Sequence, residues 1–258
     1  MGISIAIASG KGGVGKTALA ANIGLALAQL GKDVTILDAD IEMANLELHF
    51  GLEAVEGTLQ SVLAGESDLE SCIYHGPDGV KLVPAGMSLD GLSRADPDNL
   101  KNVLDELMES TEILLIDVPA GLSKSVISSL AVAQQVILVV IPELSSMSDA
   151  LKTKIVAKKL GTQILGVVIN RAGYDVKTDL TSQEVETILE VDVLGIIPED
   201  IEMRRATTFG QPLIRKSPNS PAAIAIKKLA KELVGEKNGQ KPTSGGVTRK
   251  FLSGVFGK

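Results

Sequence analysis

Short apolar runs rich in β-branched residues recur along the chain and alternate with stretches of helical periodicity. The runs are nearly continuous rather than alternating with polar residues, which is typical of strands covered on both faces. They occupy residues 3–8, 34–38, 80–85, 113–118, 136–141, 164–170 and 193–198. Helices between successive strands connect them in parallel through right-handed crossovers. We therefore expect an α/β fold: a single domain, doubly wound around a mainly parallel sheet.

The helical stretches carry their own start and end signals. Residues 16–30 are rich in Ala and Leu and are followed by Gly31, the residue preferred just past a helix end. Thr181 and Glu184 have the spacing of a capping box. Further helices are expected over residues 97–109, 146–160, 181–190 and 219–234. The uncharged segment 125–142 is long enough to be considered as a membrane span, but it is better explained as a helix followed by the strand at 136–141.

Composition excludes several classes of protein. With 45% apolar but only 2% aromatic residues among 258, the chain must build its core from aliphatic side chains. A net charge of −7 argues against a dedicated nucleic-acid binder, because binding phosphates requires clustered Lys and Arg. Cys72 is the single cysteine, so an intrachain disulfide framework is excluded. The apolar run at 3–8 is too short for a signal peptide, and we expect a cytoplasmic protein.

A glycine-rich segment lies between the first expected strand and the first expected helix. Residues 10–17, GKGGVGKT, fit the pattern G-x-x-x-x-G-K-[ST], whose backbone N–H groups surround phosphate oxygens. Lys16 can reach the β- and γ-phosphates, and the Thr17 hydroxyl can ligate Mg²⁺. The pattern predicts that ATP with Mg²⁺ binds here. The predicted contact residues are Gly10, Lys11, Gly12, Gly13, Val14, Gly15, Lys16, Thr17 and Ala18.

Acidic residues stand at the ends of two expected strands. Asp38 and Asp40 occur in ILDADIE, and Asp117 occurs in ILLIDVPAG. In an open parallel sheet, ligands gather at the carboxyl ends of the strands. Because Mg²⁺ prefers oxygen ligands, all three carboxylates are candidates for the metal and phosphate site.

Several of these segments resemble one known family. SGKGGVGKT, with its additional Lys11, is similar to the deviant Walker A motif of the MinD/ParA ATPases. LDADIEMANLELHFGLE resembles the MinD branch in particular, and DVPAGL, PELSSMSDALK, VVINRAG and IPED resemble further family segments. The similarity extends over about residues 2–235.

The resemblance implies a role for each matched residue. Lys11 would cross the interface of an ATP-dependent homodimer and touch the partner's phosphates, acting in catalysis with Lys16. Asp40 would position the attacking water, while Asp38 and Asp117 would hold Mg²⁺ together with Thr17. The adenine would be bound by Asn170, Arg171, Pro198, Glu199 and Asp200, and Asp149 would lie at the dimer face.

The resemblance also implies a slow, switch-type ATP hydrolase that acts in the placement of the division site or of other proteins. A regulatory protein like MinC or MinE is an expected partner. The stretch DIEMAN differs from the family's frequent DIGLRN at Glu42 and Ala44, which changes the charge beside the switch segment.

The end of the chain differs in composition from the rest. The P-loop ATPase domain is expected over 1–235, a Gly-rich flexible linker over 236–246 and an amphipathic membrane-targeting helix over 247–258. One such helix is too short to be stable alone, whereas two tails in a dimer gain avidity for lipid. We expect a protein peripheral on the cytoplasmic face of the membrane. The lipid-facing residues would be Val247, Phe251, Leu252, Val255 and Phe256.

Other functions remain open at this stage. A ParA-type partition ATPase would bind DNA, against which the acidic balance and the tail argue. A flagellar-placement relative would share both the ATPase domain and the tail. An iron–sulfur carrier of the Mrp or nitrogenase-iron-protein type uses paired cysteines, which Cys72 alone does not supply.

Overall fold

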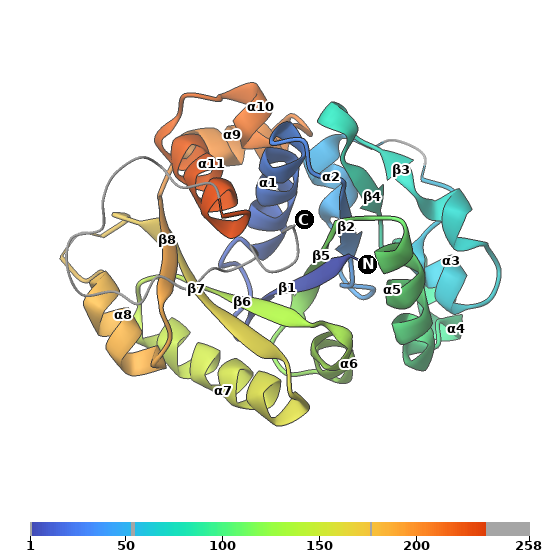
Figure 1. The fold of residues 1–258 in the computed structure, drawn as a ribbon, viewed down its shortest axis with the longest axis horizontal. Helices are drawn as coiled ribbons and strands as arrows, with labels where there is room; N and C mark the ends of the chain where they lie inside the picture. Colours follow the sequence, from blue (N-terminus) through green and yellow to red (C-terminus); the bar gives the residue numbers. More distant parts are fainter. Residues whose placement is uncertain (1, 53–54, 176, 236–258) are drawn as a thin grey trace.

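A single eight-stranded sheet runs through the molecule (Figure 1), in a computed structural model that describes residues 2–52, 55–175 and 177–235. The strand order is β3-β4-β2-β5-β1-β6-β7-β8. All neighbours are parallel except β3, which pairs antiparallel with β4 at one edge. The strands are β1 (Ile3–Ser9), β2 (Val34–Asp38), β3 (Tyr74–His75), β4 (Lys81–Val83), β5 (Ile113–Ala120), β6 (Gln135–Val140), β7 (Gln163–Ala172) and β8 (Val193–Pro198).

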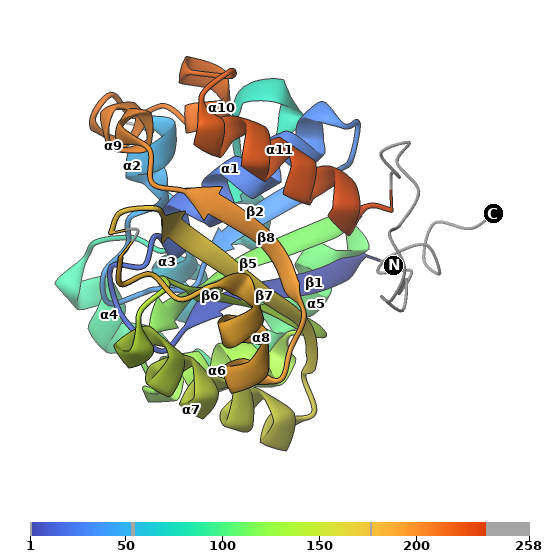
Figure 2. The same ribbon diagram turned by 90° about the vertical axis from the view of Figure 1, so that its left-hand side faces the viewer.

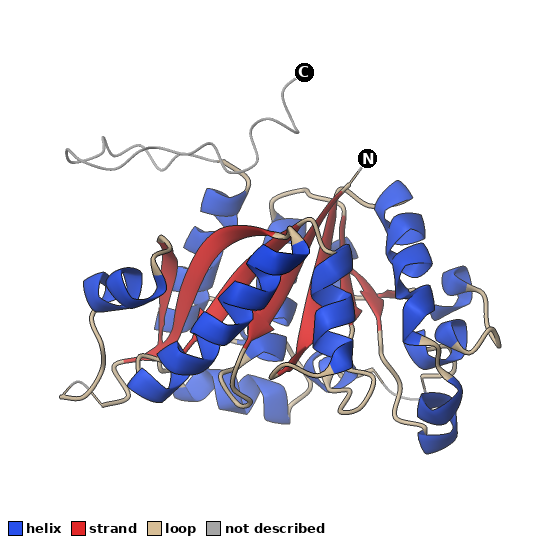
Figure 3. Cartoon of the chain, turned by 90° about the horizontal axis from the view of Figure 1, so that it is seen from below, coloured by secondary structure: helices blue, strands red, loops and turns tan. Residues whose placement is uncertain are grey.

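Helices cover both faces of this sheet, as Figure 2 shows with α1, α10 and α11 above it and α6, α7 and α8 below. The α-helices are α1 (Lys16–Gln29), α2 (Leu46–Phe50), α3 (Leu59–Leu63), α4 (Leu89–Arg94), α5 (Leu100–Glu109), α6 (Lys124–Val132), α7 (Leu144–Leu160), α8 (Ser182–Leu189), α9 (Ile201–Thr208), α10 (Leu213–Lys216) and α11 (Pro221–Leu233). Short 3₁₀ turns occur at Leu69–Cys72, Pro77–Gly79 and Pro97–Asn99. In Figure 3 the strands cross the centre of the molecule with helices around them.

The core consists of two aliphatic layers, one on each face of the sheet. Successive residues of β1 alternate between them: Ile5 and Ile7 pack toward α1 and α11, while Ala6 and Ala8 pack toward the side of α5, α6 and α7. This alternation follows from the two-residue period of a strand. Because both faces are buried, both sets of side chains are apolar, as the continuous runs predicted. The expected doubly wound, mainly parallel fold is confirmed.

Most expected elements are present within a few residues of their predicted bounds. The Thr181–Glu184 capping box forms, since the Thr181 backbone N–H donates to Glu184 Oε2 at 2.8 Å. The segment 125–142 contains all of α6 except its first residue and the whole of β6, and no helix in the described residues is long and apolar enough to span a membrane. The helix expected over 97–109 is divided, because a 3₁₀ turn at Pro97–Asn99 precedes α5.

The predicted linker at 236–246 and the predicted tail helix at 247–258 lie outside the described residues. The described chain ends just after α11, which packs against α1 and β8. The domain boundary expected near residue 235 and the lipid-facing role of the tail therefore stay predictions.

Candidate nucleotide and magnesium site

The P-loop connects the end of β1 to the first turn of α1, at the carboxyl edge of the sheet. Gly15 is the N-cap residue of α1 and has φ of 91°, a left-handed conformation that disfavours any residue with a Cβ atom. The first N–H groups of a helix have no intrahelical acceptor and carry partial positive charge. The first turn of α1 contains Lys16 and no acidic residue, so this helix end is suited to an anion.

Asn170, near the end of β7, is hydrogen-bonded to the P-loop, residues 10–17. Its Nδ2 donates to the Val14 carbonyl at 2.7 Å, and its side chain is buried. A Cβ atom on Gly15 would lie 2.5 Å from the same Nδ2, so the glycine permits this close packing. We expected Asn170 to contact adenine. The structure places it against the phosphate loop, and its contact with the base stays a prediction.

The first half of α7 also packs against the P-loop. A Cβ atom on Gly10 would lie 2.3 Å from the Asp149 carbonyl oxygen, so the two segments are in close contact. Lys11 Nζ lies 3.2 Å from Glu143 Oε2 and 3.3 Å from Ser145 Oγ of its own chain. The predicted reach of Lys11 to a partner's phosphates and the place of Asp149 at a dimer face are not tested by a single chain.

Asp38 organises the loop that follows β2. Its Oδ1 accepts from the Asp40 backbone N–H at 2.9 Å, and its Oδ2 accepts from the N–H groups of Asn45 and Leu46, each at 3.1 Å. Burial raises the pKa of Asp38 well above its ordinary value, and the nearby Asp117 carboxylate raises it further. The three backbone donors act in the opposite direction. Asp38 therefore ties residues 40–46 to the end of the sheet.

Asp117 lies beside Asp38 in the register of strands β5 and β2 and is also buried. Burial raises the pKa of Asp117 to about 6, and the Asp40 carboxylate contributes in the same direction. A hydrogen bond from Thr17 and the charge of Lys16 lower it. Lys16, Thr17 and the three predicted acids thus meet at one edge of the sheet, as the sequence indicated.

Asp117 Oδ1 is buried and has no hydrogen-bond partner among the described residues. A buried unpaired carboxylate oxygen is costly unless a ligand or water satisfies it. The residues therefore fit Mg²⁺: Thr17 and Asp117 are hydrogen-bonded to each other, and the carboxylate of Asp38 lies near that of Asp117. No group of three or more His, Cys, Asp or Glu side chains in the described chain forms a complete metal cage. Mg²⁺ is usually held by one or two carboxylates together with phosphates and waters.

The residues predicted for adenine binding lie together at the carboxyl ends of β7 and β8. Arg171 Nε donates to Glu199 Oε2 at 2.7 Å, and its guanidinium lies 5.3 Å from the centre of the Tyr174 ring. Asp200 accepts from the Glu202 N–H at 3.0 Å and from the Ala222 N–H at 3.1 Å. Asp200 is thus the N-cap residue of α9 and also accepts a hydrogen bond from the first turn of α11.

Glu143 and Ser145 were not among the residues predicted for the site. They lie in the segment PELSSMSDALK, in which the family resemblance implies a role only for Asp149. Their contact with Lys11 joins residues more than a hundred positions apart, so no local pattern reveals it. No local sequence pattern reveals the hydrogen bond from Asn170 to the Val14 carbonyl either, since these two residues are also far apart in the chain.

Comparison with known proteins agrees with this geometry. The family model described as the CobQ/CobB/MinD/ParA nucleotide binding domain matches residues 5–213. An ATP-binding protein of Methanocaldococcus jannaschii is 48% identical, and the alignment covers 100% of this chain and 98% of that protein.

Two solved structures are similar over most of the chain. The septum site-determining protein MinD of Pyrococcus horikoshii, complexed with Mg-ADP, has a TM-score of 0.88 at 38% identity, covering 91% of this chain and 97% of that one. The MinC:MinD cell division protein complex of Aquifex aeolicus has a TM-score of 0.81 at 31% identity, covering 93% of this chain and 98% of that one.

Proposed function

The chain belongs to the CobQ/CobB/MinD/ParA family of nucleotide-binding proteins, with ATP and Mg²⁺ as its cofactors, and we propose that it is a switch-type ATPase of the MinD kind. In this proposal ATP binding joins two copies, the pair associates with the membrane, and hydrolysis releases it. The cellular role is spatial regulation of cell division or of protein position.

One observation carries the proposal above all. Lys16 and Thr17 stand at a helix N-terminus beside Asp117, whose buried Oδ1 has no hydrogen-bond partner among the described residues. Hydrolysis requires attack of water on the γ-phosphorus and cleavage of its bond to the β–γ bridging oxygen, which gives ADP and phosphate. Bound Mg²⁺ neutralises charge on the phosphate oxygens. Lys16 adds positive charge there, and Asp40, half-exposed at the loop end, orients the water.

Dimerisation is supported by the position of Lys11. Its side chain lies at the surface, 40% exposed, and its pair with the half-exposed Glu143 is a surface contact of small net energy. Such a contact exchanges readily for the stronger attraction of a triphosphate carried by a second copy. A MinC-like regulator is supported by the similarity to MinD in the MinC:MinD complex.

Membrane association is supported by the sequence of residues 247–258 alone. Five apolar residues at helical spacing and the cations Arg249, Lys250 and Lys258 match a lipid-surface helix. The acidic net charge disfavours the DNA-binding alternative.

The test is light scattering of the purified full chain with ADP and with ATP, each with Mg²⁺, with and without anionic liposomes, together with phosphate release. We expect twice the mass with ATP only, sedimentation with liposomes under that condition, and slow phosphate release. The same mass with both nucleotides would refute the dimer switch. Equal liposome binding with ADP and ATP would refute nucleotide-controlled membrane association.

A further inference from the structure

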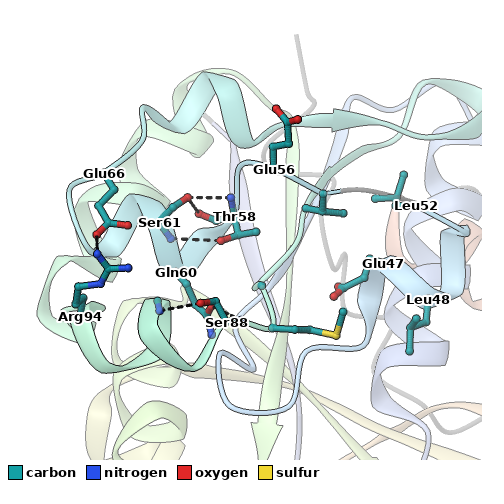
Figure 4. A pocket seen from close by; sticks show the side chains of 14 residues that line it. Glu47, Leu48, Leu52, Glu56, Thr58, Gln60, Ser61, Glu66, Ser88 and Arg94 are labelled. Atoms are coloured by element: carbon teal, nitrogen blue, oxygen red, sulfur yellow. Dashed lines mark hydrogen bonds and ion pairs between the residues drawn. The ribbon is translucent and has the colours of Figure 1, made fainter.

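A cavity of about 500 Å³ lies beside the nucleotide site but does not include any P-loop residue. It is bounded by α2 on one side and by α3 and α4 on the other, and Figure 4 shows Glu47 and Leu48 facing Gln60, Ser88 and Arg94 across it. A cavity of this volume is within the range of small-ligand sites. The lining residues that matter here include Glu47, Leu48, Glu66, Met87 and Arg94.

Glu47 lines this cavity and has an unpaired carboxylate oxygen. The residue is only 3% exposed, and its Oε2 has no hydrogen-bond partner in the described part of the chain. A buried carboxylate oxygen without a partner is rare, because its desolvation is not compensated. A ligand that donates hydrogen bonds and carries positive charge would supply what Glu47 lacks.

The remaining charges of the lining make the cavity negative. Three carboxylates line it, those of Glu47, Glu56 and Glu66, against the single guanidinium of Arg94. Arg94 is paired with Glu66 rather than with Glu47: its Nη1 lies 2.5 Å from Glu66 Oε1. The described lining residues therefore carry a net formal charge of minus two, which disfavours phosphates and other anions as ligands.

The cavity lining also contains apolar side chains that are open to solvent. Leu48 is 50% exposed and Met87 is 72% exposed, and Leu52 and Val55 line the same cavity. An aliphatic stem lying against these side chains would be removed from water, which stabilises the complex. Long cationic side chains commonly place their stems along apolar surface in this way.

We propose that the cavity between α2, α3 and α4 binds an aliphatic cation, an ammonium or guanidinium head paired with Glu47 on a stem packed against Leu48 and Met87. The same chemistry is offered by a free alkylamine or alkylguanidine and by a Lys or Arg side chain of a partner protein. The test below distinguishes these two sources.

The cavity wall is joined to the loop of the ATPase site. Gln60 Nε2 donates to the Ile41 carbonyl at 2.8 Å, and Gln60 Oε1 accepts from the Ser88 N–H at 3.2 Å. Glu47 directly follows Leu46, whose N–H binds Asp38. A regulatory effect on ATP turnover rests on the proposed function, whereas cation binding does not, so binding is measured on the nucleotide-free full chain.

The experiment is an NMR titration of the full chain with n-butylguanidinium, n-pentylammonium and the neutral n-pentanol, followed through the Gln60 side-chain amide. A second arm uses a short blocked peptide with a central arginine between leucines and its citrulline counterpart. We expect at least one cation to bind and its neutral analogue to bind at least about tenfold more weakly, a difference of about 1.4 kcal/mol.

Two variants with the same change in charge make the test specific. Glu47→Gln keeps the shape of the side chain and should lower cation affinity at least about tenfold, while Glu70→Gln, at an exposed glutamate outside the cavity, should leave it within about twofold. Binding of the alkyl cations identifies a small-molecule site, and binding of the arginine peptide alone identifies a partner's side chain. No binding by any cation up to about 10 mM, or equal affinity in Glu47→Gln, would overturn the proposal.

Discussion

Burial of the Asp117 carboxylate lowers the stability of the nucleotide-free protein. Its folded-state pKa of about 6 exceeds the ordinary value of 3.8, chiefly because the side chain is buried. Each pKa unit corresponds to about 1.36 kcal/mol, so the ionised carboxylate destabilises the folded state by up to about 3 kcal/mol at pH 7. Asp117→Asn removes this charge with little change in shape. The pKa of about 6 already includes the opposing attraction of Lys16 and the hydrogen bond from Thr17. Because the substitution also changes that hydrogen bond, we expect a net gain of about 1–3 kcal/mol.

The contribution of Asp117 to the free energy of unfolding changes with pH in a defined direction. Between pH 3.8 and about 6 the folded protein binds more protons at Asp117 than the unfolded chain does, so this group makes the wild type less stable as pH rises. Below pH 3.8 the residue is protonated in both states and its contribution disappears. The advantage of Asp117→Asn should therefore be small near pH 4, grow as pH rises, and level off above about pH 6.

The assay is thermal and urea unfolding of the nucleotide-free protein from pH 4 to 8. For a chain of this size the expected gain at pH 7 raises the Tm by roughly 2–10 °C. Asp68→Asn, at an exposed aspartate, is the matched control and should change little. Added Mg-ATP should stabilise the wild type more than Asp117→Asn, because only the wild type retains the carboxylate. An Asp117→Asn protein that is less stable than wild type at pH 7, or whose advantage is equal at pH 4 and pH 7, would refute the reasoning.

Further substitutions test the other parts of the site. Lys16→Ala should abolish ATP binding in a fluorescent-nucleotide titration, and unchanged affinity would remove Lys16 from the phosphate site. Asp40→Ala should retain ATP binding but stall phosphate release and leave an ATP-bound dimer in light scattering; normal turnover would contradict its role with the water. Gly15→Ala should weaken ATP binding at least about tenfold, because φ is 91° and the new Cβ would meet Asn170 Nδ2 at 2.5 Å; wild-type affinity would show that the loop tolerates the change. Deletion of residues 247–258 should abolish ATP-dependent liposome sedimentation while light scattering still detects the dimer, and unchanged sedimentation would exclude the tail as the membrane anchor.

The sequence alone was enough to predict the local features of this protein. The continuous apolar runs predicted a sheet buried on both faces, since strands with one solvated face would alternate with polar residues. The P-loop could be identified because its glycines, Lys16 and Thr17 act within one short segment. The place of Asp38 and Asp117 also followed, because parallel strands bring their carboxyl ends to one edge. Elements of five or six residues, such as α2 and α4, were missed because they are too short to show a helical period.

Only the tertiary structure determined which distant residues meet. Asn170 contacts Val14 and Glu143 contacts Lys11 because the sheet order places β7 and the start of α7 beside the P-loop. The raised pKa of Asp117 likewise comes from burial, which depends on the packing of the whole domain. Nothing in the sequence distinguishes Glu47 from other acidic residues. Only the fold buries it at a cavity, where its Oε2 has no hydrogen-bond partner among the described residues. Local chemistry is encoded by neighbouring residues, whereas burial and long-range contact arise only when the chain has packed.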